Sequence, residues 1–515
     1  MGGLKRSLTI ALVCGAFGAF HATSAQDLPT DFWPARHLGI LHDFGHFWAV
    51  NTVYKPYRWE RLVGVEHRNG VAHTSGLGWV LTDLLDETAG HPAGGGNPVD
   101  TLQVQAWPGA LLQQPAGEAA PFSGFAGAPY VNLSAWFRTH LSAQLYLRAT
   151  TDPQSLPHFT GQPREIRRFG INAAEFDQAL LSYQNNWLVA QFGRGRQIWG
   201  PFESQNVVLS ANSPAYDHFM VEARYKRMKL RVFYGFLESR RLDDVNVNRY
   251  VVGHGLEYTN RKNLVIGLSE IVVLSGKDRP LDLAYLNPFL PAVEVELNDR
   301  TNKDAGTASS NAVWSLAVDW MPWHGLRLSG NFSVDEFQFD AADRRQGRGD
   351  ALAYAVRAAY SRTLGRVSAT LSADYTKIGT FTFSHELGTN NFVTRDRPLG
   401  SDLGSDADRL RFGVRFLLPW RTIVETAGGV QRDGERNILR APYQFYTFEE
   451  FRVGPFPSGR VQTTRFLEGR VTYLPRPNLE FQLAGRLASG TGRSVTNQSY
   501  VILAFNAYLP WRLGF

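Results

Sequence analysis

The stretch SYVILAFNAYLPWRLGF, residues 499–515, alternates between apolar and mixed positions over its whole length. From residue 501 onward, the odd positions are all apolar: Val501, Leu503, Phe505, Ala507, Leu509, Trp511, Leu513 and Phe515. Successive side chains of a β-strand point to opposite faces, so one face of this strand is wholly apolar. The pattern indicates a strand with one face in lipid and the other in a polar barrel interior. An edge strand of a soluble sheet is the alternative, but the rest of the chain repeats the pattern.

Residues 1–25 have the composition of a cleavable secretory signal, with a basic start, an apolar centre and small residues before Gln26. The only cysteine, Cys14, lies inside this segment, and the preceding Val13 is too large for a lipoprotein site. We therefore expect a mature chain without thiol chemistry or a lipid anchor. The formal charge of +6 over 515 residues is too mild to indicate nucleic-acid binding.

The mature chain contains no apolar run of 18 residues, so the sequence predicts no transmembrane helix. It is instead rich in glycine (49 residues) and in aromatic residues (13%). An exported chain of this composition fits a β-barrel, whose strands have a low average hydrophobicity.

Residues 26–128 differ from the rest and are expected to form a periplasmic or plug segment, with the barrel at 129–515. One helix is predicted at residues 78–88, ended by the Pro- and Gly-rich run at 92–98. The spacing of His37, His42 and His46 raises the question of a metal site. No cysteine or carboxylate completes a ligand set, so we interpret them as partly exposed structural histidines and expect no metal or cofactor.

From Val131 onward, apolar residues keep one parity through successive predicted hairpins. Short turns are predicted at 184–186, 226–228, 260–262, 321–325, 361–365, 419–421 and 475–478. Longer polar connections are predicted at 195–217, 237–248, 275–311, 338–350, 379–408, 432–460 and 489–498. Short turns at one end and long loops at the other are typical of outer-membrane barrels. The sequence thus predicts an all-β fold, an antiparallel transmembrane barrel of 16 strands. The number rises to 18 if residues 131–149 form a hairpin and 101–107 contribute a strand.

The first long connection combines glycines, arginines and a tryptophan. Arginine binds carboxylates bidentately, and sugars stack on aromatic rings, so this loop is a candidate polysaccharide site at the barrel rim. A purely structural rim loop is the simpler alternative. The candidate residues are Arg194, Arg196, Trp199, Gly200, Pro201 and Asn212.

Residues 249–258 read as a strand whose odd positions face the lumen. Small residues there would let a plug approach closely, and the candidate plug contacts are Arg249, Gly253, Gly255 and Glu257. His254 has the opposite parity from Glu257, so an acid–base pair between them is not expected. Glu270 is a further candidate, although it shares the lipid-facing parity of its strand. We therefore predict a bulge at residues 269–270, or a strand already clear of the bilayer.

The longest predicted external connection contains Tyr285, Asn287 and Pro288, followed by several acidic residues. A cation or sugar site is conceivable there, but a solvated loop is the simpler interpretation.

The run Trp199-Gly200-Pro201, followed by residues 209–212, resembles the Wzi-type capsule-assembly family of outer-membrane proteins. The order and spacing of residues 249–257, 267–270 and 285–288 also resemble that family. The sequence departs from the pattern at Phe202, where glycine is expected, and in showing only one convincing helix before the barrel. The resemblance implies an 18-stranded barrel closed by a periplasmic helical segment, acting as a lectin that holds capsular polysaccharide.

Three functions follow from these patterns, in decreasing order of preference. The first is a non-enzymatic outer-membrane protein that binds or anchors exported polysaccharide through many weak contacts. The second is a porin or oligosaccharide channel. The third is a barrel enzyme, for which no convincing catalytic set is visible. Expected partners are outer-membrane lipid, polysaccharide and the barrel assembly machinery, which would recognise the strand ending at Phe515. We expect a monomer.

Overall fold

The computed structural model describes residues 27–28, 33–58, 75–89 and 103–514. The last range has gaps at 118–119, 123, 138–139, 157, 166, 168–169, 243, 298–308, 337–344, 346, 348, 386, 445, 447–449, 451–453 and 493–498. The predicted signal at residues 1–25 lies outside the described residues. So does Phe515, the last residue of the strand that the assembly machinery is expected to recognise. Among the described residues, no helix is long and apolar enough to cross a membrane.

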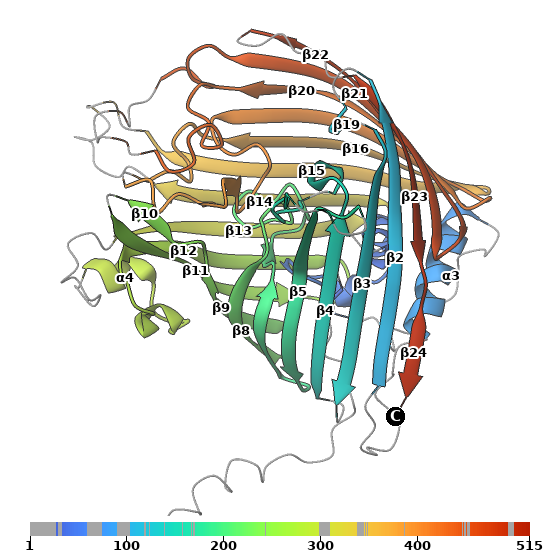
Figure 1. Cartoon of the computed structure of the whole chain (residues 1–515), viewed down its shortest axis with the longest axis horizontal. Coiled ribbons are helices and arrows are strands. Elements are labelled where there is room, and N and C mark those ends of the chain that lie inside the picture. Colours follow the sequence, from blue (N-terminus) through green and yellow to red (C-terminus); the bar gives the residue numbers. More distant parts are fainter. Residues whose placement is uncertain are drawn as a thin grey trace, which may run out of the picture.

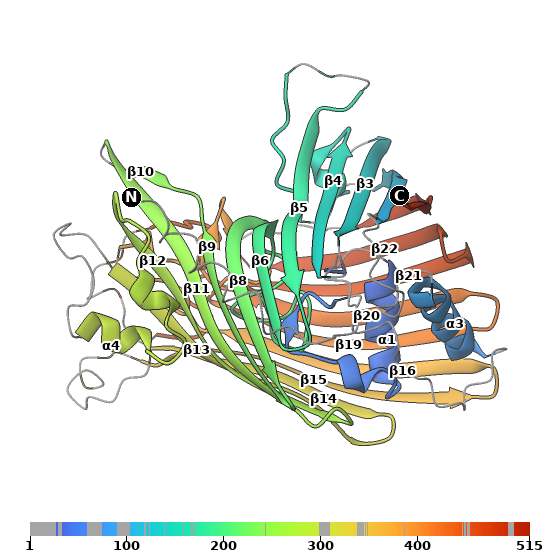
Figure 2. The same cartoon turned by 90° about the horizontal axis from the view of Figure 1, so that it is seen from below.

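One antiparallel sheet closes on itself to form the barrel seen in Figures 1 and 2. Its strands are β2 (Gln103–Ala116), β3 (Ala126–Phe137), β4 (Leu141–Thr150), β5 (Ala173–Gln184), β6 (Leu188–Gly195), β8 (Tyr216–Tyr225), β9 (Met228–Phe236), β10 (Arg240–Leu242), β11 (Val245–Thr259), β12 (Leu264–Lys277), β13 (Ser309–Trp323), β14 (Leu326–Glu336), β15 (Ala351–Leu364), β16 (Val367–Ile378), β19 (Ala407–Leu418), β20 (Thr422–Asp433), β21 (Gln462–Arg476), β22 (Leu479–Thr491), β23 (Tyr500–Tyr508) and β24 (Trp511–Gly514).

The barrel has 18 strand positions. β10 continues β9 along β11, and β24 continues β23 along β2, so two pairs of segments each act as one strand. Closure comes from β2, which pairs with β3 on one side and with β23 and β24 on the other. The higher predicted strand number is therefore confirmed, with residues 126–150 forming a hairpin. The predicted start of the barrel at residue 129 is wrong, because β2 already belongs to the wall.

The predicted alternation of short turns and long connections is confirmed. We call the end with the short turns, such as 226–227 and 419–421, the turn end, and the opposite end the loop end. The outward parity is apolar and exposed, as Leu503 and Phe412 show with 58% exposure each. An apolar outer face and a polar inner face are the requirements of a barrel in a bilayer.

The lumen contains a plug, which we define as residues 27–28, 33–58 and 75–89. Its elements are α1 (Trp33–Asp43), the 3₁₀ helix η1 (Trp48–Val50), β1 (Tyr54–Lys55) and α3 (Gly76–Ala89). α3 lies at the turn end, where the indole of Trp79 donates to the carbonyl of Leu418 at 2.8 Å (Figure 2). The helix predicted at 78–88 is confirmed, whereas α1 was not predicted.

Long connections fold inward from the loop end. The connection between β6 and β8 carries β7 (Ile198–Trp199), which pairs with β1 of the plug. The connection between β16 and β19 carries the hairpin β17 (Val393–Thr394) and β18 (Arg397–Pro398). Plug, inward loops and wall share one buried apolar cluster that includes Tyr54, Trp199 and Phe392. The remaining elements are η2 (Pro153–Ser155), η3 (Leu283–Leu286) and α4 (Ala292–Leu297).

Candidate functional site

The predicted rim loop lies inside the barrel, against the plug. Trp199 is only 2% exposed, and its ring lies 4.6 Å from the ring of Tyr54 and 5.2 Å from that of Phe233, measured between centroids. Its backbone pairs with β1, so the plug and the loop form a small sheet. The prediction that Trp199 sits at the rim and stacks on sugar is wrong, because no face of this ring is accessible.

The other predicted rim residues have structural contacts. Arg196 is buried and forms an ion pair with Asp177 at 2.5 Å, while Arg194 points outward and pairs with Asp217 at 2.8 Å. Asn212 is buried and donates to the carbonyl of Ser204 at 2.6 Å. Gly200 and Pro201 lie where the loop contacts the plug. Gly200 adopts a φ of 138°, and the carbonyl of Pro201 accepts from the Lys55 ammonium at 2.8 Å. Of the six predicted rim residues, only Arg194 stays substantially exposed, whereas Trp199, Gly200, Pro201 and Asn212 are buried.

The predicted plug contacts on β11 do face the lumen. Glu257 accepts from the Thr52 hydroxyl at 2.6 Å and from the backbone N–H of Val53 at 2.8 Å. Its other oxygen pairs with Lys229 at 2.8 Å. The missing side chains of Gly253 and Gly255 leave the space that Trp199 and Tyr54 occupy. Arg249 donates instead to the carbonyls of the inward loop, at 2.9 Å to Asn391 and 2.8 Å to Val393.

Glu270 does not face the lumen, and the predicted bulge beside it is absent. The register between β11 and β12 is regular through residues 269–270, so Glu270 points outward and pairs directly opposite His254. The external connection covers both side chains. Tyr285 of this connection is 1% exposed and packs on the outer wall, whereas Asn287 is exposed and Pro288 is half-buried. The connection is therefore not a free solvated loop.

The plug histidines are more buried than predicted. His37 and His42 are both 0% exposed, while His46 is half-buried. The ring of His37 contacts the rings of Trp33 and Trp79, and burial lowers its pKa below the usual value. Burial lowers the pKa of His42 to about 3, so this side chain is neutral at physiological pH. The described residues contain no group of three potential metal ligands.

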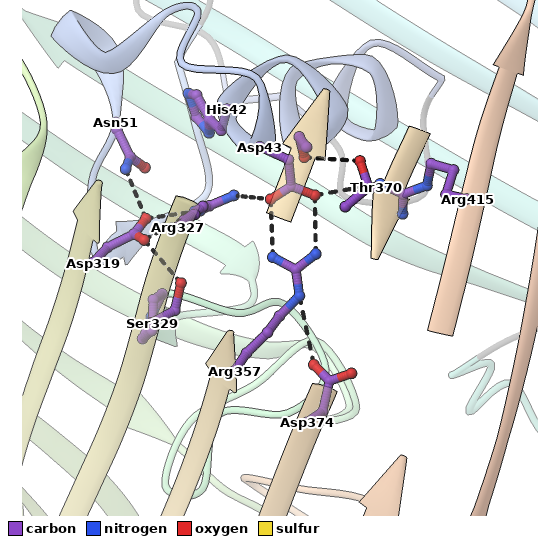
Figure 3. A network of polar contacts seen from close by, with 12 residues as sticks. His42, Asp43, Asn51, Asp319, Arg327, Ser329, Arg357, Thr370, Asp374 and Arg415 are labelled. Carbon is purple, nitrogen blue, oxygen red and sulfur yellow. Dashed lines mark hydrogen bonds and ion pairs between the residues drawn. The ribbon is translucent and has the colours of Figure 1, made fainter. Parts of the chain in front are cut away.

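An aspartate at the end of α1 fastens the plug to the wall (Figure 3). Asp43 is 2% exposed and accepts from Arg327 at 2.8 Å, from Arg357 at 2.9 Å and from Arg415 at 3.4 Å. These arginines stand on β14, β15 and β19. Burial alone would raise the pKa of Asp43, but Arg357 and Arg327 hold it well below the usual range. We call this cluster the Asp43 lock.

Beside the lock, the lumen-facing side of β19–β22 carries a row of charged residues. Arg411 pairs with Glu468 at 3.0 Å and Arg415 pairs with Glu425 at 2.7 Å. Arg470 follows on the same face of β21 and is exposed. The side chains of Arg411 and Glu468 remain 32% and 34% exposed, unlike the buried groups of the lock.

Aromatic rings accompany these charges. The guanidinium of Arg486 lies 5.2 Å from the ring centroid of Phe466, and Tyr500 stands opposite Arg486 on β23. Among the described residues, neither Arg470 nor Arg486 forms an ion pair. We call the set Arg411, Phe466, Glu468, Arg470, Arg486 and Tyr500 the charged wall. It offers guanidinium donors, a carboxylate acceptor and the half-buried ring of Tyr500, whereas Phe466 is buried beneath Arg486; the exposed groups together suit an acidic sugar polymer.

The charged wall was not predicted from the sequence. The alternation of Arg409, Arg411 and Arg415 with Leu410 and Phe412 was a visible signal of a basic inner face. Polar residues are expected on every inner face of such a barrel, however. The sequence does not distinguish the arginines that bind the plug from those that stay exposed, because this difference depends on where the plug lies.

A closed barrel of 18 antiparallel strands, with an apolar outer face and a plugged polar lumen, defines an outer-membrane β-barrel. The sequence matches no protein-family model and no curated protein sequence. Among solved structures, the fold is similar to that of Wzi of Escherichia coli, described as a carbohydrate-binding β-barrel involved in group 1 capsule assembly. The TM-score is 0.58 at 11% identity, over 95% of this chain and 99% of that one. OprD of Pseudomonas aeruginosa aligns with a TM-score of 0.43 at 9% identity, over 80% of this chain and 95% of that one.

Proposed function

We propose that this protein binds exported polysaccharide with acidic groups at the cell surface, without catalysing a reaction. The observation that carries the proposal is the charged wall beside a fixed plug. The Asp43 lock holds the plug beside the charged wall, and Arg470 and Arg486, which form no ion pair among the described residues, are available there for carboxylates. The fold likeness to Wzi, itself described as carbohydrate-binding, supports the same reading.

The mechanism would be summed weak contacts with a repeating polymer. Each guanidinium–carboxylate contact contributes about 1.5–3 kcal/mol, and neighbouring repeats add to the retention time of one chain. We propose that the protein is exported by its predicted signal and assembled through its last strand. It would then act in the outer membrane as a monomer.

Deleting the gene is expected to move polysaccharide from the cell-bound fraction into the medium without changing total output. Retention at the surface is lost while synthesis and export continue. The measurement is the amount of polysaccharide in washed cells and in culture supernatant. An unchanged distribution would contradict anchoring, and a fall in total output would indicate a role in export instead.

Arg470→Glu and Arg486→Glu are each expected to weaken binding of the purified barrel to acidic polysaccharide by about tenfold or more. Each substitution removes a donor and adds like-charge repulsion at the charged wall. The measurement is polysaccharide binding to immobilised protein, repeated at rising salt because ionic contacts are screened. Arg465→Glu is the matched control, since Arg465 lies on β21 but has the outward parity of Leu467. An equal loss in the control would rule out the charged wall as the site.

A diffusion channel is the second candidate, and the exposed part of the charged wall favours it. Arg411 and Glu468 keep a third of their side-chain surface accessible inside the barrel. Conductance of the purified protein in a planar bilayer separates the two functions. The anchoring proposal expects a silent barrel, whereas steady ion conduction would favour the channel.

A further inference from the structure

A polar pair stands on the outer, lipid-facing side of the barrel wall. His254 of β11 and Glu270 of β12 are paired in register, with 3.6 Å between His254 Nδ1 and Glu270 Oε2. Their neighbours on the same face, Leu256 and Leu268, are 45% and 51% exposed, as expected for lipid-facing side chains. Both members of the polar pair are nevertheless buried.

The register places this pair within the apolar band. Glu270 lies opposite Trp314, and Trp320 of the same strand lies near the turn end. Six residues, at about 3.3 Å each and a tilt of about 40°, place Glu270 roughly 15 Å above Trp320. The apolar band of such barrels is about 25 Å tall. An uncovered carboxylate at this level would face hydrocarbon, which is costly.

The external connection reaches down to this level and covers the pair. The carbonyl of Tyr285 accepts from Nε2 of His254 at 2.6 Å, and Glu270 accepts from the backbone N–H of Ala292 at 3.1 Å. The ring of Tyr285 belongs to a buried apolar cluster with Tyr234 and Tyr250 of the outer wall. We call residues 281–292 the outer hook. The helix α4 begins at the last residue of the hook and lies outside the wall in Figures 1 and 2.

Several backbone N–H groups of the outer hook are paired within the hook itself. The N–H groups of Ala284 and Phe289 donate to the side chains of Asp282 and Asn287, both at 3.1 Å. Those of Asn287 and Leu290 donate to backbone carbonyls at 3.3 Å and 3.2 Å. Pro288 and Pro291 have no N–H group. Internal pairing of backbone groups is what a non-aqueous environment requires.

Large apolar side chains point away from the wall on this same segment. Leu281, Leu283 and Phe289 are 44%, 68% and 83% exposed. They belong to the segment that contacts the wall at Glu270, and the outward-facing neighbours of Glu270, Leu268 and Trp314, are 51% and 42% exposed. An aqueous loop would gain nothing from this arrangement, because exposing three large apolar side chains to water is unfavourable.

We propose that the outer hook lies in the outer leaflet of the membrane, with Leu283 and Phe289 among the acyl chains. The polar pair holds the outer hook against the wall by two hydrogen bonds, and the outer hook in turn shields the polar pair from lipid. The outer hook would thus act as an in-plane anchor that fixes the depth of the barrel. This proposal does not depend on the polysaccharide-binding proposal.

The test uses single cysteines, because the mature chain is expected to contain none. Phe289→Cys and Leu283→Cys are labelled with an environment-sensitive fluorophore, and the barrel is reconstituted at high dilution in vesicles with nitroxide-labelled acyl chains. Phe412→Cys, on the apolar band of β19, is the lipid control. Asp244→Cys is the water control, since that side chain is 91% exposed in an external hairpin. Each variant is first checked for a folded barrel.

Hook labels are expected to be quenched by the nitroxide lipids at least about threefold more than the label at 244, and to resist aqueous iodide. Their behaviour should approach that of the label at 412. Iodide quenching equal to that at 244 would overturn the proposal by placing the hook in water. Protection that depends on protein density would also overturn it, since a second copy would then cover the hook. Two labelled positions keep the result readable if one variant fails to fold.

Discussion

Asp43→Asn is expected to release α1 from the wall. The substitution should make docking of the plug less favourable by about 3 kcal/mol. Losing one partner of a buried ion pair typically costs about 3–5 kcal/mol, because the remaining charge stays buried. The lower end applies here because each arginine keeps a second carboxylate. Arg327 retains Asp319 at 2.7 Å and Arg415 retains Glu425 at 2.7 Å. Bilayer conductance and proteolysis of residues 33–43 are the measurements.

Wild-type barrels should be electrically silent, and Asp43→Asn barrels should show openings. Asp402→Asn is the matched control, since Asp402 forms a single pair with Arg409 at 2.9 Å and is half-exposed. Exposed pairs of this kind contribute about 1 kcal/mol or less. Openings of equal size in the control would show that the lumen conducts for reasons unrelated to the plug.

Acid should not open the Asp43 lock until the pH is very low. The pKa of Asp43 is depressed in the folded state, so its contribution is complete above the unfolded pKa of about 4. It is lost only as the pH falls through the lower folded value. Conductance should therefore stay silent from neutral pH down to about pH 4.

The barrel itself could be predicted because alternation is a local property of each strand. The parity of residues 499–515 and the spacing of turns are read directly from the chain. α1 escaped prediction because polar residues such as His37, His42 and Asp43 are buried beside its apolar ones, so burial does not follow hydrophobicity along this helix. A helix inside a lumen lacks the water-facing side on which that signal depends.

The sequence shows where the long connections lie in the chain, but not whether each one projects outward or folds into the lumen. Parity tells which way a strand residue points, yet nothing local to Trp199 says whether its loop projects outward or folds into the lumen. Glu270 shows the same limit. Its outward parity was read correctly from the sequence, and a bulge was predicted to remove the cost of facing lipid. The structure removes that cost by covering the carboxylate with Ala292, which is distant in the sequence.

Gly255→Val is expected to displace β1 of the plug, because the space at this position is already taken. A Cβ there would lie 2.5 Å from the ring of Tyr54 and 2.9 Å from that of Trp199. Tyr54 cannot easily move aside, since its hydroxyl donates to the carbonyls of Leu268 at 2.8 Å and Leu256 at 3.2 Å. Overpacking of this kind costs about 1–3 kcal/mol. Thermal unfolding and proteolysis of the plug are the measurements.

Gly469→Ala is the control for Gly255→Val, because the nearest atom to a Cβ at residue 469 is 3.9 Å away. The double variant Asp43→Asn/Gly255→Val then tests whether α1 and β1 of the plug dock as one unit or independently. If the plug docks as one unit, releasing it at Asp43 already removes the clash at Gly255, and the second substitution adds little. Additive losses would instead mean that α1 and β1 leave the wall independently. A lumen that opens in two steps, as α1 and β1 leave the wall separately, would fit a gated channel better than a fixed binding surface.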